Sequence, residues 1–170
     1  YATTYNQPYQ LWRDKEMTVN EQVDRNAFAE TDMTDVIMQY DHEGRVFARV
    51  GNGTLALESD GHGLKIRANL GGTEIGRQLF EEIKGGYTDK MSIGFTVSGQ
   101  KRSEEQIDGI TYYHRRITGF KKLYDVSANP VRRTNLGYLF CNDTMLQEDA
   151  PETLRKRLSV TSDKYLHAYR

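Results

Sequence analysis

The feature that most constrains this chain is a short segment in which apolar and polar side chains alternate strictly. At residues 64–70, Leu, Ile, Ala and Leu take every second position, and Lys, Arg and Asn lie between them. A period of two is typical of a β-strand with one buried face. The same period returns at residues 91–101, where Ile93, Phe95 and Val97 share one face and small polar residues the other. The pattern therefore predicts a chain built mainly from half-buried strands.

Turn residues separate the other strand-like segments. Gly51-Asn52-Gly53, Asp60-Gly61 and Asp108-Gly109 are typical of tight reversals. They predict a hairpin joining residues 45–50 to 54–59, a reversal before residue 64, and strands at 110–118 and 120–127. The polar, Tyr-rich start of the chain predicts one or two short strands, followed by a short helix or loop near residues 26–34.

One segment has a helical period. At residues 73–84, Ile75, Leu79 and Ile83 recur every four positions, Thr73 suits an N-cap, and Gly85-Gly86 suits a C-terminal stop. Many short strands with one helix predict a mainly β fold with few helices, as a barrel or sandwich. We expect this domain to cover residues 1–141. Residues 142–170 are charged and lack glycine, which predicts a helical or extended C-terminal tail.

Composition narrows the classes of function. Lys and Arg number 23 and Asp and Glu 24, so the chain as a whole does not attract nucleic-acid phosphates. This balance argues against a nucleic-acid-binding barrel, although 11 tyrosines could stack on bases. No apolar run approaches the roughly 20 residues of a membrane helix. No Cys/His cluster has metal-site spacing and no phosphate-binding glycine loop is present, so we expect a soluble protein with no membrane segment, metal or cofactor.

Three residues stand out as candidates for chemistry, each with an ordinary explanation beside it. Ser92 lies on the small, polar face of its strand, where Gly94 leaves room for another group, yet the pattern alone favours an ordinary solvent-facing serine. His42 lies among carboxylates and is suited to act as a base near neutral pH, or as a surface histidine. Strict alternation puts Asp125 on the face of Leu123, where a buried carboxylate needs a partner; a nearby arginine is the ordinary expectation.

The order of several motifs resembles that of a known family. They are Tyr-Asp-His-Glu at 40–43, Gly-Thr-Leu at 53–55, Met-Ser-Ile-Gly-Phe at 91–95 and Leu-Tyr-Asp-Val-Ser at 123–127. Together with Asn-Ala-Phe at 26–28 they resemble the prohead serine proteases of tailed bacteriophages, distant relatives of the herpesvirus assemblins. The resemblance runs to about residue 135. It implies a herpesvirus-protease-like, mostly antiparallel β-barrel with flanking helices.

The resemblance also implies roles for individual residues. Ser92 would be the nucleophile, His42 the general base and Asp125 the group that orients the imidazole. Assemblins use a second histidine in the third role, so His114 remains an alternative to Asp125. Arg132 and Arg133 are candidates for holding the loop that faces the oxyanion. After Asp125 the chain departs from the family pattern, with Asn-Pro-Val-Arg-Arg-Thr at 129–134.

The implied function is a serine endopeptidase of capsid maturation. It would act inside the prohead, in the host cytoplasm, on the major capsid protein or scaffold and often on itself, and self-association fits such assembly-dependent control. The alternative is a noncatalytic β-barrel module for capsid or scaffold assembly, in which Ser92 and His42 are ordinary polar residues. The approach of these two side chains separates the hypotheses.

Overall fold

The computed structural model of the protein describes residues 1–130, and the expected tail at 142–170 lies outside them. The chain runs in the order β1 (Thr3–Thr4), β2 (Tyr9–Arg13), β3 (Met17–Val23), β4 (Ile37–Tyr40), β5 (Glu43–Arg49), a 3-10 turn (Val50–Asn52), β6 (Leu55–Ser59), β7 (Gly63–Ala68), α1 (Glu74–Lys84), β8 (Lys90–Ile107) and β9 (Ile110–Asn129). The prediction of a mainly β fold with few helices is confirmed. Residues 26–34 form turns and an isolated bridge rather than a helix.

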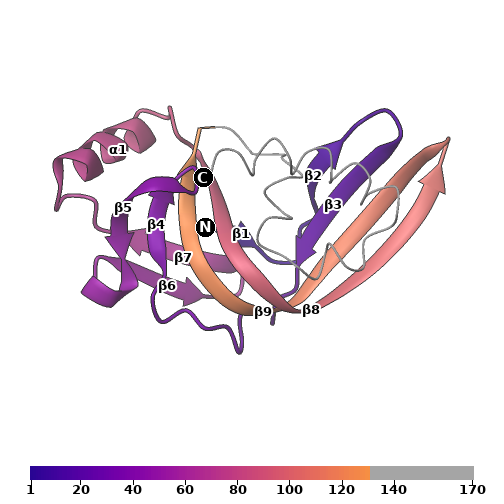
Figure 1. The fold of residues 1–170 in the computed structure, drawn as a ribbon, viewed down its shortest axis with the longest axis horizontal. Helices are drawn as coiled ribbons and strands as arrows, with labels where there is room; N and C mark the ends of the chain where they lie inside the picture. The colour runs from indigo at the N-terminus through magenta and orange to yellow at the C-terminus, as the bar shows by residue number, and fades with distance from the viewer. Residues whose placement is uncertain (131–170) are drawn as a thin grey trace, which may run out of the picture.

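Strands β8 and β9 form one long, curved hairpin that organises the molecule (Figure 1). Its tip is the predicted turn, in which Asp108 and Gly109 both have positive φ, at 51° and 79°. The sequence predicted two strands where β9 is one. Gly119 lies opposite Gly99, and the register shifts around this pair, so the hairpin bends there without breaking. Beyond the bend, the hairpin and β2–β3 form an arm that points away from α1.

Two sheets are built around this hairpin. In the larger sheet, β8 pairs with one edge of β9. On the other edge, β3 pairs with residues 111–117 of β9 and β4 with residues 125–128, which gives the path β2-β3-β9-β4-β5. The β8–β9 pair is antiparallel, whereas β3 and β4 run parallel to β9. The smaller sheet has the order β1-β7-β6. Most pairs are antiparallel, as expected, but within residues 1–130 the sheets do not close into a barrel.

The predicted hairpin at residues 45–59 is wrong, although both of its strands exist. Strand β5 pairs with β4, and β6 pairs with β7 in the other sheet. Between them the chain makes the 3-10 turn, where Val50 N–H donates to Val36 O, and Gly53 takes φ 72°. This turn carries the chain from one sheet to the other, so the glycine cluster marks a change of sheet.

Aromatic and branched side chains form the core between the sheets. Phe120 lies at its centre, with ring centroids 4.4 Å from Phe28 and 4.6 Å from Phe95. Leu123 and Val126 of β9 are fully buried in the same cluster. Near the C-terminal end of β9, one face of the strand therefore packs in the core, and the other face is available for polar groups.

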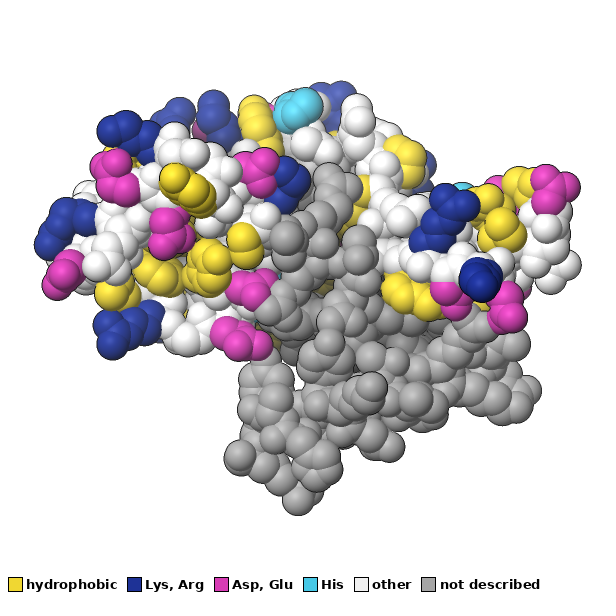
Figure 2. Space-filling view, turned by 90° about the horizontal axis from the view of Figure 1, so that it is seen from above, with side chains coloured by type: hydrophobic (Ala, Val, Ile, Leu, Met, Phe, Trp, Pro, Cys, Tyr) yellow, Lys and Arg dark blue, Asp and Glu magenta, His cyan; other side chains and the backbone are white. Residues whose placement is uncertain are grey.

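The predicted helix is confirmed as α1. Thr73 Oγ1 accepts a hydrogen bond from Gly76 N–H at 3.1 Å, and Leu79 is buried. Among the described residues no helix has the length and apolar character to cross a membrane. On the face shown in Figure 2, basic and acidic side chains are interspersed rather than segregated.

Candidate active site

His42 lies in a two-residue turn between β4 and β5. Tyr40 pairs with Glu43, which leaves only Asp41 and His42 to reverse the chain. Both have positive φ, 53° and 62°, the conformation of the hairpin turns that match strand twist. Such φ values are uncommon for residues other than glycine, although Asp and His adopt them more often than most. The turn is therefore the local device that presents the imidazole.

Three polar side chains on one face of β9 hold this turn. They occur at alternate positions, so they share a face. Asn129 Nδ2 donates to Asp41 Oδ1 at 3.0 Å, Ser127 Oγ accepts from His42 N–H at 2.7 Å, and Asp125 Oδ1 lies 2.6 Å from His42 Nδ1. All three are nearly or fully inaccessible to solvent. The end of β9 thus binds the turn at both of its residues and at the imidazole.

The contact between His42 and Asp125 has the geometry of a base and its orienting acid. The side chains are 1% and 11% exposed, so the bond is shielded from water. A carboxylate at Nδ1 favours the tautomer with the proton on that nitrogen, which leaves the lone pair on Nε2. It also stabilises the cation that forms when Nε2 takes a proton. Of the two partners considered for Asp125, a nearby arginine and His42, the structure pairs it with His42, the residue that the family resemblance named.

Gly94 creates the space that Asp125 occupies. The two residues are cross-strand partners. A Cβ at residue 94 would lie 2.0 Å from Asp125 Oδ2, closer than real Cβ atoms approach, and 3.0 Å from its Cγ, so the carboxylate would have to move. The absence of a side chain at residue 94 is therefore what lets the carboxylate reach His42.

Ser92 lies on the same face of the hairpin as these groups. It pairs with Ser127, and directly opposite residues of antiparallel strands project to the same side with Cβ atoms about 4.5–5.5 Å apart. Ser92 is half-buried, and Ile93 beside it packs against the core. The structure thus brings His42 and Asp125 into contact and places Ser92 across from Ser127, the serine that binds the His42 backbone.

One family model covers most of the chain. The model of the caudovirus prohead serine protease matches residues 1–133. The chain belongs to this family. No curated protein and no solved structure gives a significant match. The prohead-protease resemblance of the sequence motifs is therefore confirmed, and with it membership of a serine protease family.

Of the remaining candidates of this prohead protease family member, the structure describes only His114. His114 lies on the arm, where Nε2 is 3.1 Å from Glu105 Oε1 and the side chain is 40% exposed. Arg132 and Arg133 lie outside the described residues. Within residues 1–130, no group of three or more His, Cys, Asp or Glu side chains is arranged to hold a metal ion.

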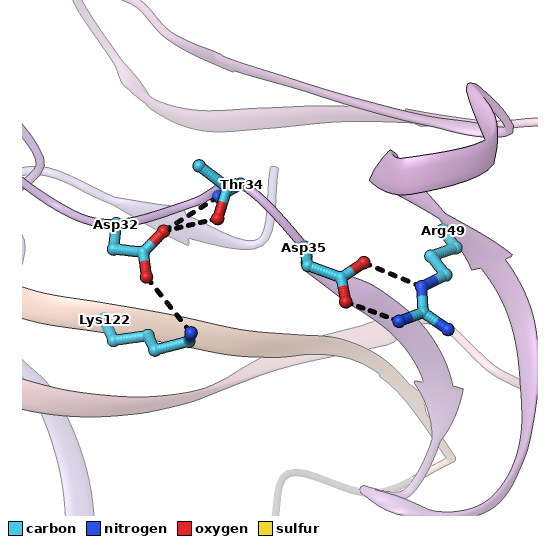
Figure 3. A network of polar contacts seen from close by, with 5 residues as sticks. All are labelled: Asp32, Thr34, Asp35, Arg49 and Lys122. Atoms are coloured by element: carbon cyan, nitrogen blue, oxygen red, sulfur yellow. Dashed lines mark hydrogen bonds and ion pairs between the residues drawn. The ribbon is translucent and has the colours of Figure 1, made fainter.

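Ion pairs fasten the segment that leads into β4 (Figure 3). Asp32 lies 3.1 Å from Lys122 Nζ of β9, and Asp35 forms a two-point pair with Arg49 of β5. Hydrogen bonds from the hydroxyl and amide of Thr34, and then Lys122, lower the pKa of Asp32 to about 2. The Arg49 guanidinium likewise lowers the pKa of Asp35. The first pair joins the segment before β4 to β9, and the second joins that segment to the end of β5, across the open end of the hairpin whose turn carries His42.

Sequence reasoning missed the roles of Ser127 and Asn129 in this prohead protease fold. It placed Leu123 on the face of Asp125, but the β8–β9 register passes from Gly94–Asp125 to Phe95–Leu123 and skips Tyr124. This bulge returns Leu123 to the core while Asp125 stays on the site face. Beyond the bulge, the alternation of polar residues at 125, 127 and 129 was the available signal.

Proposed function

We propose that this chain is a serine endopeptidase of phage capsid maturation, with Ser92 as nucleophile, His42 as general base and Asp125 as the orienting acid. The observation that carries the assignment is the 2.6 Å contact between His42 Nδ1 and Asp125 Oδ1 on the face that carries Ser92. Membership of the prohead protease family supports the class of reaction.

Acylation follows from these roles. His42 Nε2 takes the hydroxyl proton as Ser92 Oγ attacks the carbonyl carbon of the scissile peptide bond, and Asp125 stabilises the resulting imidazolium. The tetrahedral intermediate carries a negative oxygen that needs backbone N–H donors. We propose that Arg132 and Arg133 support the loop that supplies these N–H donors. The intermediate collapses when His42 returns its proton to the leaving amine.

Deacylation repeats the steps with water. His42 removes a proton from a water molecule, whose oxygen attacks the ester carbonyl of the acyl-Ser92, and the proton then passes to Ser92 Oγ. The peptide is released with a new carboxyl terminus. This scheme uses side chains and backbone N–H groups of the chain and water, without a metal or cofactor.

The substrates that fit this function are proteins of the assembling capsid. We propose that the protease acts inside the prohead, in the host cytoplasm, on the major capsid protein or the scaffold, and that it also cleaves itself. Self-association would couple its activity to assembly.

The test is intact mass spectrometry of the full-length gene product coexpressed with its capsid protein. Wild type is compared with Ser92→Ala and with Ser103→Ala, in which an exposed serine of the arm is replaced. We expect fragments in wild type and Ser103→Ala, and none in Ser92→Ala. Uncleaved capsid protein in all three samples, with normal assembly, would favour a noncatalytic assembly module. Cleavage that persists in Ser92→Ala would contradict the assignment of the nucleophile.

A further inference from the structure

His42 has a backbone conformation that its surroundings must impose. Its φ is 62°, and the preceding Asp41 is also left-handed, at 53°. A residue with a side chain keeps such a conformation only where neighbouring groups determine it. The direction in which the imidazole leaves the turn depends on this backbone angle, so whatever fixes the turn also aims the ring.

A buried hydroxyl binds the backbone N–H of His42, next to the N–Cα bond about which φ is measured. The N–H of His42 donates to Ser127 Oγ over 2.7 Å, and Ser127 is 0% exposed. The neighbouring Asp41 is held by Ala128 O, which accepts its N–H at 3.0 Å, and by Asn129. The Ser127 bond differs from these because it is made to the histidine itself.

Ser127 is also the cross-strand partner of Ser92. The residue that binds the His42 backbone therefore lies opposite the proposed nucleophile. In the same hairpin, Gly94 pairs with Asp125 and Ser92 pairs with Ser127. We infer that Ser127 is a positioning residue of the protease, whose hydroxyl fixes the His42 backbone so that the imidazole contacts Asp125 and faces Ser92. This inference rests on the proposed function.

Two substitutions separate an acceptor role from a packing role. Ser127→Ala removes the oxygen and leaves a small void, whereas Ser127→Cys fills that space with a slightly larger group that is only a weak sulfur acceptor. We expect both variants to react with a fluorophosphonate probe on the order of 10- to 100-fold more slowly than wild type, which is the scale of a misplacement of about 1 Å. Ser103→Ala is the matched control and should react at the wild-type rate.

Proton NMR of the same proteins reads the position of the imidazole without using activity. In wild type, the Nδ1 proton between His42 and Asp125 should give a downfield resonance protected from exchange. It should broaden or move upfield in both Ser127 variants. A Ser127→Cys variant with the wild-type labelling rate and the wild-type resonance would overturn the inference, because filling the space at residue 127 would then be sufficient without a strong acceptor.

Amide hydrogen exchange on wild type keeps the inference testable if both variants fail to fold. The His42 amide should exchange as slowly as the neighbouring core amides of β9, and rapid exchange would overturn the inference. The proposed function fails separately: wild type would then not be labelled at Ser92, while the NMR and exchange measurements would still report on Ser127 and His42.

Discussion

The carboxylate of Asp125 occupies the space that a side chain at residue 94 would fill. A Cβ there would lie 2.0 Å from Asp125 Oδ2. The glycine and the acid are opposite one another on the two strands of one hairpin, so a side chain at residue 94 would have to displace the carboxylate. The Gly in Met-Ser-Ile-Gly-Phe and the Asp in Leu-Tyr-Asp-Val-Ser thus form one structural unit.

Gly94→Ala should displace Asp125 from His42. We expect hydrolysis or labelling of Ser92 to fall about 10²- to 10⁴-fold, the range between misplacing and losing the orienting acid. Overpacking should also lower the free energy of unfolding by about 1–3 kcal/mol. Labelling kinetics and urea unfolding measure the two effects. The control is Gly72→Ala, where a Cβ meets no atom within 4 Å. Wild-type kinetics in Gly94→Ala would show that Asp125 does not need this space.

Asp125→Asn should identify the third member of the site. An amide at this position favours the wrong imidazole tautomer, so we expect kcat to fall by about 10⁴-fold with little change in KM. His114→Gln should leave both parameters near wild type, because His114 bonds to Glu105 on the arm. Steady-state kinetics on a peptide from the mapped cleavage site makes the comparison. The opposite ranking of the two variants would assign the role to His114.

A buried ion pair lies within the arm. Arg115 Nη1 lies 2.8 Å from Glu21 Oε2, their side chains are 1% and 2% exposed, and Gln100 and Tyr9 bond to the same pair. Arg115→Met leaves the Glu21 carboxylate without this cation, which should lower the free energy of unfolding by about 3–5 kcal/mol. Urea unfolding measures the loss.

The double variant Glu21→Leu/Arg115→Met provides the internal comparison for this pair. It removes both charges, so it should be more stable than Arg115→Met alone. Arg13→Met, on the exposed surface of β2, should have little effect. Equal stability of Arg115→Met and wild type would mean that the pair contributes nothing to the arm.

The hydrogen bonds that Asp32 accepts from Thr34, together with its pair to Lys122, should make the stability of the fold depend on pH in the acid range. The folded pKa of Asp32 is about 2, against 3.8 for an ordinary Asp. A lowered pKa stabilises the fold above the unfolded value, and the contribution is lost as the pH falls toward the folded value. The difference in unfolding free energy between wild type and Asp32→Ala should thus be constant from about pH 7 to 5 and shrink from about pH 4 to 2. A difference that stays constant down to pH 2 would contradict this effect.

Local patterns predicted the elements better than their pairing. The helix, the turn at Asp108-Gly109 and the alternation in β8 are encoded by neighbouring residues, and each is confirmed. The partners of β5 and β6 are not encoded locally. Gly51-Asn52-Gly53 is compatible with a hairpin or a change of sheet, and contacts with β4 and β7 decide between them.

The candidate site likewise combines features that the local sequence encodes with features that depend on strand pairing. Ser92, His42 and Asp125 were identified from short motifs and from the order of these motifs along the sequence. The separation of Leu123 and Asp125 onto different faces depends on the bulge at Tyr124, a property of two paired strands that alternation along a single strand does not contain. Ser127 looked like an ordinary strand residue because its partner, the His42 amide, is 85 positions away.

The single run of β9 through both arm and site has a consequence for how such chains can vary. Side chains alternate along a strand, so a shift of one residue sends each to the other face, whereas matched additions to β8 and β9 at the Asp108-Gly109 tip leave the earlier rungs in place. The length of the arm can therefore differ between relatives, provided that β8 and β9 gain or lose the same number of residues. The stretch from Tyr124 to Asn129 has no such freedom, because one inserted or deleted residue there would turn the acid or the anchoring serine toward the core.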